Sequence, residues 1–411
     1  MVRAPSASTV EAARTLPIVR PVEPTRLFTR SYSLVAVATF LFFAAFGASL
    51  PILPRYVVDV LGGGDATVGV VFAVYAAAAV VVRPIIGRIG DRSGRRILVQ
   101  GGALLTALAL FGHVLADSVG LLIALRILAG AGQAAVVVGF STLSIDLAPP
   151  ARQGEGASYV MVALQLGLGL GPVLGELALG VGGYDLVWIA SGIGSLVCLL
   201  LAMALPRPAA RRALTSTGLF HPAAIRPGVV LWLGTLGFVG FLAFVPLYAR
   251  TIGVGRVGLL FLLCSGTIAL VRTLGARLPD RLGAVRLGSV GLVLVTAAML
   301  VLGLIPTPAG LYTATILLGL GAAIVAPSMV VAAVAGVPHD ERARVMSTFT
   351  MFLDLASAIG PFALGLAAAS TGYGPTFAVA GAAAGLGLVL LRLWLAPRLA
   401  TTPRVVLDTP N

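Results

Sequence analysis

The sequence contains no lysine, and all 28 of its basic residues are arginine. Acidic residues are also scarce, at 15 of 411, so only 10% of the chain is charged. A water-soluble protein of this length needs more charge to cover its surface, which excludes an ordinary soluble domain. With 58% hydrophobic residues, the chain is predicted to be an integral membrane protein. We attribute the missing lysine to codon composition, because lysine would anchor a loop equally well.

Cysteine and histidine are equally sparse. The two cysteines, Cys198 and Cys264, each fall inside an apolar run, and the three histidines are scattered. Neither pattern indicates a disulfide framework or a metal site. No nucleotide-binding loop or nucleophile constellation is present, so we expect no cofactor and no enzymatic activity. The net charge of +13 does not indicate nucleic-acid binding, because the arginines lie in short loops between apolar runs.

Apolar runs of about 20 residues or more predict membrane-spanning helices. Twelve are expected, at 31–54, 67–87, 97–116, 119–147, 156–181, 184–205, 227–249, 256–276, 286–305, 309–335, 344–370 and 375–396. The predicted fold class is an all-α membrane protein with two six-helix pseudo-repeats. The expected segments are a cytoplasmic tail at 1–30, a bundle at 31–205, a linker at 206–226, a bundle at 227–396 and a tail at 397–411.

The arginines predict the orientation of these spans. With the twelve spans in place, 22 arginines fall on one side, three on the other, and three within spans. Positive loops remain in the cytoplasm, so both termini and the linker are expected there. The chain is therefore predicted to be a multi-pass protein of the inner or plasma membrane.

The two halves also repeat each other. One constant offset along the chain aligns Arg83 with Arg272, and Gly171–Pro172 with Gly360–Pro361; we call it the repeat offset. It holds over about 100 residues, which predicts two bundles related by an axis normal to the membrane. Such a body can rock its halves about a site at their interface.

The densest cationic segment is the hairpin GRIGDRSGRR at 87–96, between two predicted spans. Its glycines allow a tight turn, and its aspartate can accept hydrogen bonds from arginine. This segment could simply hold the topology through its positive charge, or it could form a charged latch between the halves. The aspartate and the spaced glycines favour the latch, because positive charge alone does not require them. The candidate latch residues are Gly87, Asp91, Arg92, Gly94, Arg95 and Arg96, with Asp146 beside them at the end of a span.

These residues resemble the signature loop of the major facilitator superfamily, G-x-x-x-D-R-x-G-R-R. Arg126, Gly130 and Gly132 resemble that family's R-x-x-x-G-x-G element. A third match, to G-x-x-x-G-P-x-x-G, lies at Gly167, Gly171, Pro172 and Gly175. In the family this last motif is associated with exporters that exchange substrate for protons. The resemblance implies a twelve-helix transporter but does not imply a substrate.

The third motif has its own physical meaning. Gly167, Gly171 and Gly175 are four residues apart, so they form one bare helix ridge that a neighbouring helix can approach closely. Pro172 removes a backbone hydrogen bond and is expected to bend the span. The alternatives are ordinary small-residue packing and a conformational hinge or seal, and the resemblance favours the second.

Three charged residues within spans are candidates for proton coupling. Arg126 is costly inside a membrane and should face a cavity or a carboxylate, unless it snorkels outward. The resemblance implies that this arginine assists proton coupling. Glu176 and Asp354 are the acids deepest within spans, and either could carry the proton. Alternatively, Glu176 faces water at the outer mouth and Asp354 pairs with cytoplasmic arginines. The first and seventh predicted spans, 31–54 and 227–249, contain no acidic residue, whereas many drug–proton exchangers of the family carry one in the first span.

Polar and aromatic residues within spans could line a substrate cavity, although interhelical packing or lipid contact is equally consistent. The candidates are Tyr75, Gln133, Gln165 and Phe241. We expect a monomeric secondary transporter whose partners are the lipid bilayer, protons and a small, partly apolar compound that it exports. The alternatives are an uptake symporter for a sugar or organic anion, and a non-transporting receptor or scaffold.

Overall fold

The computed structural model describes residues 27–149, 152–205, 221–275, 282–338 and 341–401, which contain helices and no strand. The first group of helices comprises α2 (Arg30–Ser49), α3 (Ile52–Asp59), α4 (Asp65–Ser93), α5 (Arg95–Gly112), the turn η1 (His113–Leu115), α6 (Val119–Asp146) and α7 (Gln153–Met203). The second comprises η3 (Pro222–Ala224), α8 (Ile225–Thr251), α9 (Val257–Leu274), α11 (Ala284–Leu304), α12 (Pro308–Val334), α13 (Arg342–Thr371), α14 (Tyr373–Leu390), η4 (Leu391–Leu395) and α15 (Ala396–Thr401).

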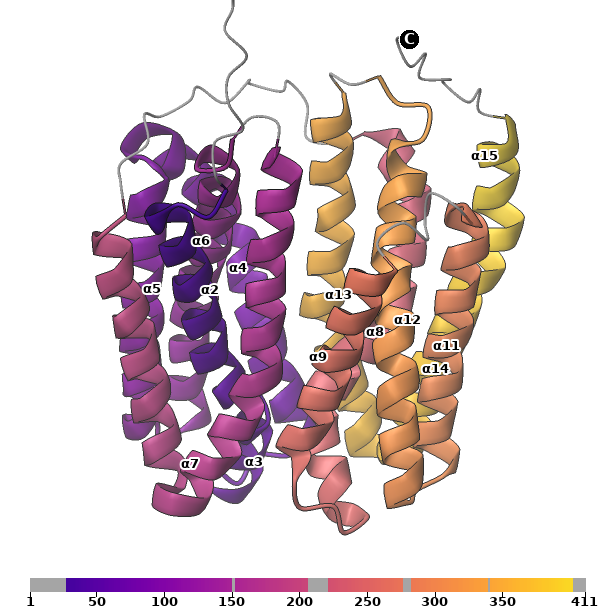
Figure 1. Ribbon diagram of the computed structural model, residues 1–411. Coiled ribbons are helices and arrows are strands. Elements are labelled where there is room, and N and C mark those ends of the chain that lie inside the picture. Colours follow the sequence, from indigo (N-terminus) through magenta and orange to yellow (C-terminus); the bar gives the residue numbers. More distant parts are fainter. Residues whose placement is uncertain (1–26, 150–151, 206–220, 276–281, 339–340, 402–411) are drawn as a thin grey trace, which may run out of the picture.

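Within the described residues, eleven helical segments are long and apolar enough to cross a membrane. One of them, α7, has 51 residues and is broken at Gly182 and Gly183, where the backbone leaves the helical region and the chain reverses (Figure 1). With α7 counted as two crossings, the chain crosses twelve times, as the apolar runs predict. The predicted boundary between these two spans, at 181–184, coincides with the break.

Most of the predicted hairpin at 87–96 is helical. Helix α4 continues through Ser93 and α5 begins at Arg95, so Gly94 alone makes the turn. Gly94 has φ +90°, a conformation that side-chain-bearing residues rarely adopt, and this single residue redirects the chain. The predicted tight turn therefore lies at Gly94, and Gly87 lies inside α4.

The same backbone conformations recur one repeat offset later in the chain. Gly283 has φ +78°, matching Gly94, and Gly372 has φ +81°, matching Gly183 at +67°. Helix packing repeats as well. Glycines let α6 lie close against α5, and glycines at the equivalent positions let α12 lie close against α11. The predicted pair of six-helix pseudo-repeats is thus confirmed.

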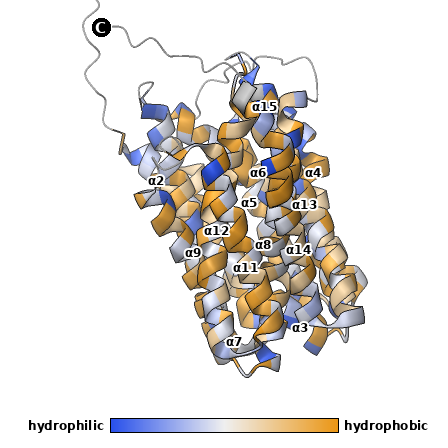
Figure 2. Cartoon of the chain, turned by 90° about the vertical axis from the view of Figure 1, so that its right-hand side faces the viewer, coloured by the Kyte–Doolittle hydropathy of each residue, from blue (hydrophilic) through white to orange (hydrophobic). Residues whose placement is uncertain are grey.

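The two groups of helices stand side by side (Figure 1). We call the end where α2 begins and α15 lies the terminal end, and the end holding α3 and the α7 break the opposite end. Contacts between the groups run mainly along two pairs of helices, α4 with α13 and α7 with α9. Hydrophobic residues cover most of the helix length and hydrophilic residues lie mostly toward the ends (Figure 2), as a membrane-spanning body requires.

The glycine ridge on α7 packs against α2. A Cβ on Gly167 would lie 2.6 Å from the carbonyl oxygen of Phe40, and Cβ atoms on Gly171 and Gly175 would collide with the backbone of α2 in the same way. The two backbones therefore touch over about two turns, which only small residues permit. This contact lies within the first group of helices rather than between the groups.

Candidate functional site

Two glycine–proline contacts close the opposite end between the groups. On α4, Gly69 lies directly against the carbonyl oxygen of Pro361 on α13. On α9, a Cβ at Gly258 would lie 2.9 Å from the carbonyl oxygen of Pro172 on α7. The repeat offset relates Gly69 to Gly258 and Pro172 to Pro361, so the two contacts are equivalent. We call them the paired seams.

A charged contact reinforces the seam between α7 and α9. The carboxylate of Glu176 accepts a hydrogen bond from the backbone N–H of Val257, the first residue of α9, at 2.7 Å. The same carboxylate oxygen lies 3.3 Å from a guanidinium nitrogen of Arg55 on α3. A carboxylate at a helix N-terminus is stabilised by the helix dipole and by the free N–H groups there. Glu176 therefore joins the two groups of helices at the opposite end.

Further polar contacts cross between the groups at this end. Arg250 on α8 contacts both carboxylate oxygens of Asp59 on α3, each at 2.9 Å. The Tyr373 hydroxyl on α14 donates to Asp65, the first residue of α4, at 2.8 Å. The ion pair is exposed, with side-chain exposures of 47% for Arg250 and 32% for Asp59. Solvent therefore screens it, and it contributes little to closure.

We expect Glu176→Gln to shift the population toward the state open at the opposite end by about fivefold or more, because a hydrogen bond to a charged group contributes about 1.5–3 kcal/mol. Asp59→Asn should shift it by less, since an exposed ion pair contributes about 0.2–1 kcal/mol. Spin labels on cysteines introduced at Val60 and Ser370 would report the separation of the groups. Equal shifts for both variants would contradict this ranking.

In the terminal half of the interface, one ion pair links α4 to α13. A guanidinium nitrogen of Arg83 lies 2.5 Å from a carboxylate oxygen of Asp354. The side chain of Asp354 is 15% exposed and that of Arg83 is 39% exposed. The structure thus gives Asp354 an arginine partner from the other group of helices.

A central cavity of about 210 Å³ lies between the groups. Its lining is mostly apolar and comes from α7, α8, α9, α12, α13 and the residue that follows α2; the polar lining residues are Gln165, Thr235, Ser265 and Arg272. A groove of about 420 Å³ between α7 and α9 shares Gln165 and Arg272 with this cavity. An apolar groove of about 500 Å³ lies between α4 and α13. Both grooves lie on the terminal side of the paired seams.

Arg126 is 2% exposed and lies inside the first group of helices. Its guanidinium carbon is 4.2 Å from the ring centroid of Tyr75 and 5.8 Å from that of Phe72. The Tyr75 ring is in turn stacked on Phe46, with centroids 5.4 Å apart. Among the described residues no carboxylate forms an ion pair with Arg126; aromatic faces hold it instead.

We expect Tyr75→Leu to lower the free energy of unfolding by about 2 kcal/mol more than Tyr75→Phe, because a desolvated cation–π contact is worth about that much. The phenylalanine variant is the matched control, since it keeps the ring face and removes only a buried hydroxyl that has no partner in the structure. Unfolding of the purified chain in detergent measures both. Equal losses would show that Tyr75 does not stabilise Arg126.

The remaining predicted latch residues lie at the terminal end. Arg96 donates to the backbone carbonyls of Leu205 at 2.7 Å and Met203 at 2.5 Å, so it fastens α5 to the end of α7. Arg92 and Asp146 are exposed, and Arg95 begins α5. The side chain of Asp91 lies outside the described residues. The latch between the groups stays a prediction.

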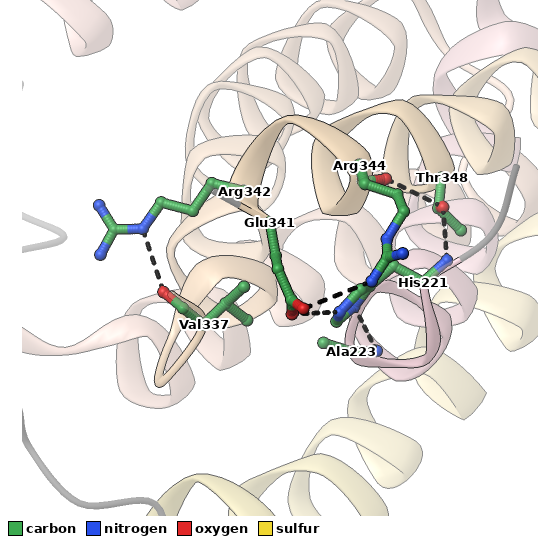
Figure 3. Close-up of polar contacts among 7 residues, drawn as sticks. All are labelled: His221, Ala223, Val337, Glu341, Arg342, Arg344 and Thr348. Carbon is green, nitrogen blue, oxygen red and sulfur yellow. Dashed lines mark hydrogen bonds and ion pairs between the residues drawn. The ribbon is translucent and has the colours of Figure 1, made fainter. Parts of the chain in front are cut away.

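A second polar cluster at the terminal end joins the start of the second group to α13 (Figure 3). The backbone N–H of Ala223 donates to Nδ1 of His221, so the ring proton is on Nε2, which contacts Glu341 at 3.1 Å. The backbone N–H of His221 donates to the Thr348 hydroxyl on α13. These contacts fix the entry of α8 against the base of α13, one wall of the apolar groove.

The predicted cavity residues have different surroundings. Gln165 lines both the central cavity and the α7–α9 groove. Phe241 is fully buried against Phe261, while its neighbour Phe238 lines the cavity. Tyr75 contacts Arg126, and Gln133 is half-buried on α6. Among the described residues, Gln165 is thus the predicted candidate that lines a cavity between the groups.

The family model of the Major Facilitator Superfamily matches residues 35–308 and 229–409. An uncharacterized MFS-type transporter of Burkholderia mallei (strain SAVP1) is 29% identical over 386 residues, covering 89% of this chain and 93% of the relative.

Two solved structures share the fold. A POT family transporter in complex with a thioalcohol-conjugated peptide has a TM-score of 0.77 at 13% identity, covering 90% of this chain and 96% of the other. The human organic anion transporter MFSD10 has a TM-score of 0.65 at 20% identity, covering 88% and 99%. The twelve crossings, the repeat and the match over most of the sequence lead to one conclusion: the chain belongs to the major facilitator superfamily and is a membrane transporter, not an enzyme.

Proposed function

We propose that this transporter exports a small, partly apolar compound from the cytoplasm in exchange for protons, by alternating access. In this proposal it acts as a monomer in the plasma membrane with its terminal end in the cytoplasm. The observation that carries the proposal is the unequal closure of the two ends. The paired seams and the Glu176 contact close the opposite end, while both grooves lie on the terminal side, and the α7–α9 groove shares Gln165 and Arg272 with the central cavity.

Alternating access requires the halves to tip about the central cavity. In the proposed cycle the compound enters the cavity from the terminal end, past Gln165 and Arg272. The seams then part, Val257 leaves Glu176, and the compound is released at the opposite end. Glycine against a carbonyl oxygen suits such a seam, because it closes tightly without interlocking side chains that would resist separation.

Asp354 is the favoured proton carrier. Its neighbour Leu353 lines the central cavity, and its carboxylate is held by Arg83 from the other group of helices. A proton on Asp354 would weaken that ion pair, so proton binding and the position of α4 against α13 would be linked. Glu176 is the second candidate, because the tipping motion would expose its carboxylate to water at the opposite end.

Inside-out membrane vesicles test the direction and the coupling. With the cytoplasmic face outward, an acidic interior should drive accumulation of an exported compound, and dissipating the pH gradient should stop it. Screening compounds by growth inhibition of deletion and overexpression strains would supply the substrates for this assay. Accumulation that instead requires an acidic solution outside the vesicles would identify an uptake symporter.

A further inference from the structure

The two helix pairs that join the groups differ by one charge. The repeat offset relates α4 to α9 and α13 to α7, so Arg83 corresponds to Arg272 and Asp354 corresponds to Gln165. Between α4 and α13 the arginine and the carboxylate form an ion pair. Between α7 and α9 the arginine is retained, but a neutral amide occupies the position of the carboxylate.

The structure brings Arg272 and Gln165 to the same space. Both residues line the central cavity of about 210 Å³ and the α7–α9 groove of about 420 Å³. Arg272 is exposed to these cavities, and it has no ion pair or hydrogen bond within the part of the chain that the structure describes. No acidic residue is among the described residues that line either cavity. Within the described residues, no carboxylate therefore compensates the positive charge between α7 and α9.

An arginine within a membrane protein normally faces a partner anion or a water-filled cavity. The amide of Gln165 can donate or accept a hydrogen bond, but it cannot neutralise a guanidinium. The rest of the cavity is largely apolar, with Leu168, Phe238 and Val325 among its lining residues. The site thus combines one cation, one amide and an apolar wall, which suits a molecule with an anionic head and a hydrocarbon body.

We infer that the transported compound is an amphipathic organic anion whose carboxylate, sulfonate or phosphate group binds Arg272 in the place of the missing carboxylate. Gln165 donates a hydrogen bond to the same group, and the apolar body lies toward Phe238. This inference rests on the proposed transport function and adds the charge of the substrate to it. The anion restores between α7 and α9 the charge balance that Asp354 gives between α4 and α13.

Binding to the purified full chain tests the inference independently of transport. The probes are benzyl, naphthyl and octyl compounds, each prepared as the carboxylate, the carboxamide and the ammonium ion. Their dissociation constants are measured by calorimetry in detergent. At least one carboxylate should bind about tenfold or more tightly than its carboxamide, because one hydrogen bond between charged groups changes a dissociation constant by about that factor. Added phosphatidylglycerol, as a competitor, distinguishes a soluble anion from an anionic lipid headgroup.

Three variants test which side chains produce the preference for the carboxylate. Arg272→Gln should abolish the preference for the carboxylate, and Gln165→Glu should do the same by supplying the anion from the chain itself. Arg286→Gln is the matched control, since Arg286 is exposed in the first turn of α11 and lines neither cavity. It removes the same charge and should keep the preference.

Two results would overturn the inference. One is a wild-type chain that binds no carboxylate in preference to its carboxamide. The other is a preference that survives both Arg272→Gln and Gln165→Glu, which would leave Arg272 as a topology anchor. A chain that binds anions at Arg272 but moves none of them in vesicles would support this site while contradicting the proposed function.

Discussion

Replacing Gly258 with leucine is expected to lower the transport rate by about tenfold or more and to hold the opposite end open. A Cβ at this position would lie 2.9 Å from the backbone of α7 and 3.0 Å from the carboxylate of Glu176, so a larger side chain must force α7 and α9 apart. Overpacking of this kind costs about 1–3 kcal/mol, which corresponds to a shift of about 5–150-fold between two states. Spin labels at Val60 and Ser370 measure the opening, and vesicle uptake measures the rate.

Gly266 provides the control on the same helix. It lies on α9, but no atom lies within 4 Å of a Cβ built there, so Gly266→Leu should preserve both transport and the closed opposite end. Gly69→Leu, at the equivalent seam between α4 and α13, should reproduce the effect of Gly258→Leu. A Gly258→Leu chain that still closes and transports at the normal rate would show that the seams do not govern access.

The second large effect concerns Asp354. We expect Asp354→Asn to reduce pH-driven transport by about tenfold or more while leaving exchange of substrate without a gradient intact, because the amide cannot cycle a proton. The substitution also leaves Arg83 without its partner. Since Arg83 is 39% exposed, water screens that charge, and the loss of stability should be only about 1–2 kcal/mol.

Glu341→Gln is the matched control for Asp354→Asn, because it removes a carboxylate that pairs with His221 at the terminal end, away from the central cavity. It should leave pH-driven transport unchanged. Glu176→Gln, tested in parallel, addresses the other candidate carrier. If Asp354→Asn retains its response to the pH gradient and Glu176→Gln loses it, the proton is carried at the opposite end instead.

The crossings and the repeat could be predicted from the sequence because both depend on local or periodic features. Apolar length alone predicts a span, and glycines with positive φ recur at a constant offset, as Gly94 and Gly283 do. The residue that makes the tight turn within 87–96 could not be predicted, because α4 continues through Ser93 and Gly94 alone reverses the chain. The end of a helix depends on the backbone conformation of a single residue, which a hydropathy pattern does not predict.

The partners of the charged residues could not be predicted, because they depend on how distant helices face each other. Asp354 pairs with Arg83 inside a span, whereas the sequence offered only the cytoplasmic arginines as its partners. Arg126 was expected beside a carboxylate or a cavity, yet it lies over Tyr75. The repeat offset does show from the sequence alone that Gln165 occupies the position equivalent to Asp354, so the two helix pairs differ by one charge.

The connections at the opposite end are very short. Those flanked by described helices there, at 50–51, 60–64, 116–118, 252–256, 305–307 and 372, have no more than five residues, and the turn inside α7 has only two. Proteolytic nicking prefers exposed loop tips with room to unfold locally. A protease confined to that face would therefore cut poorly. An epitope tag meant for that face needs a flexible spacer, and the connection at 60–64 is one of the two longest places to insert it.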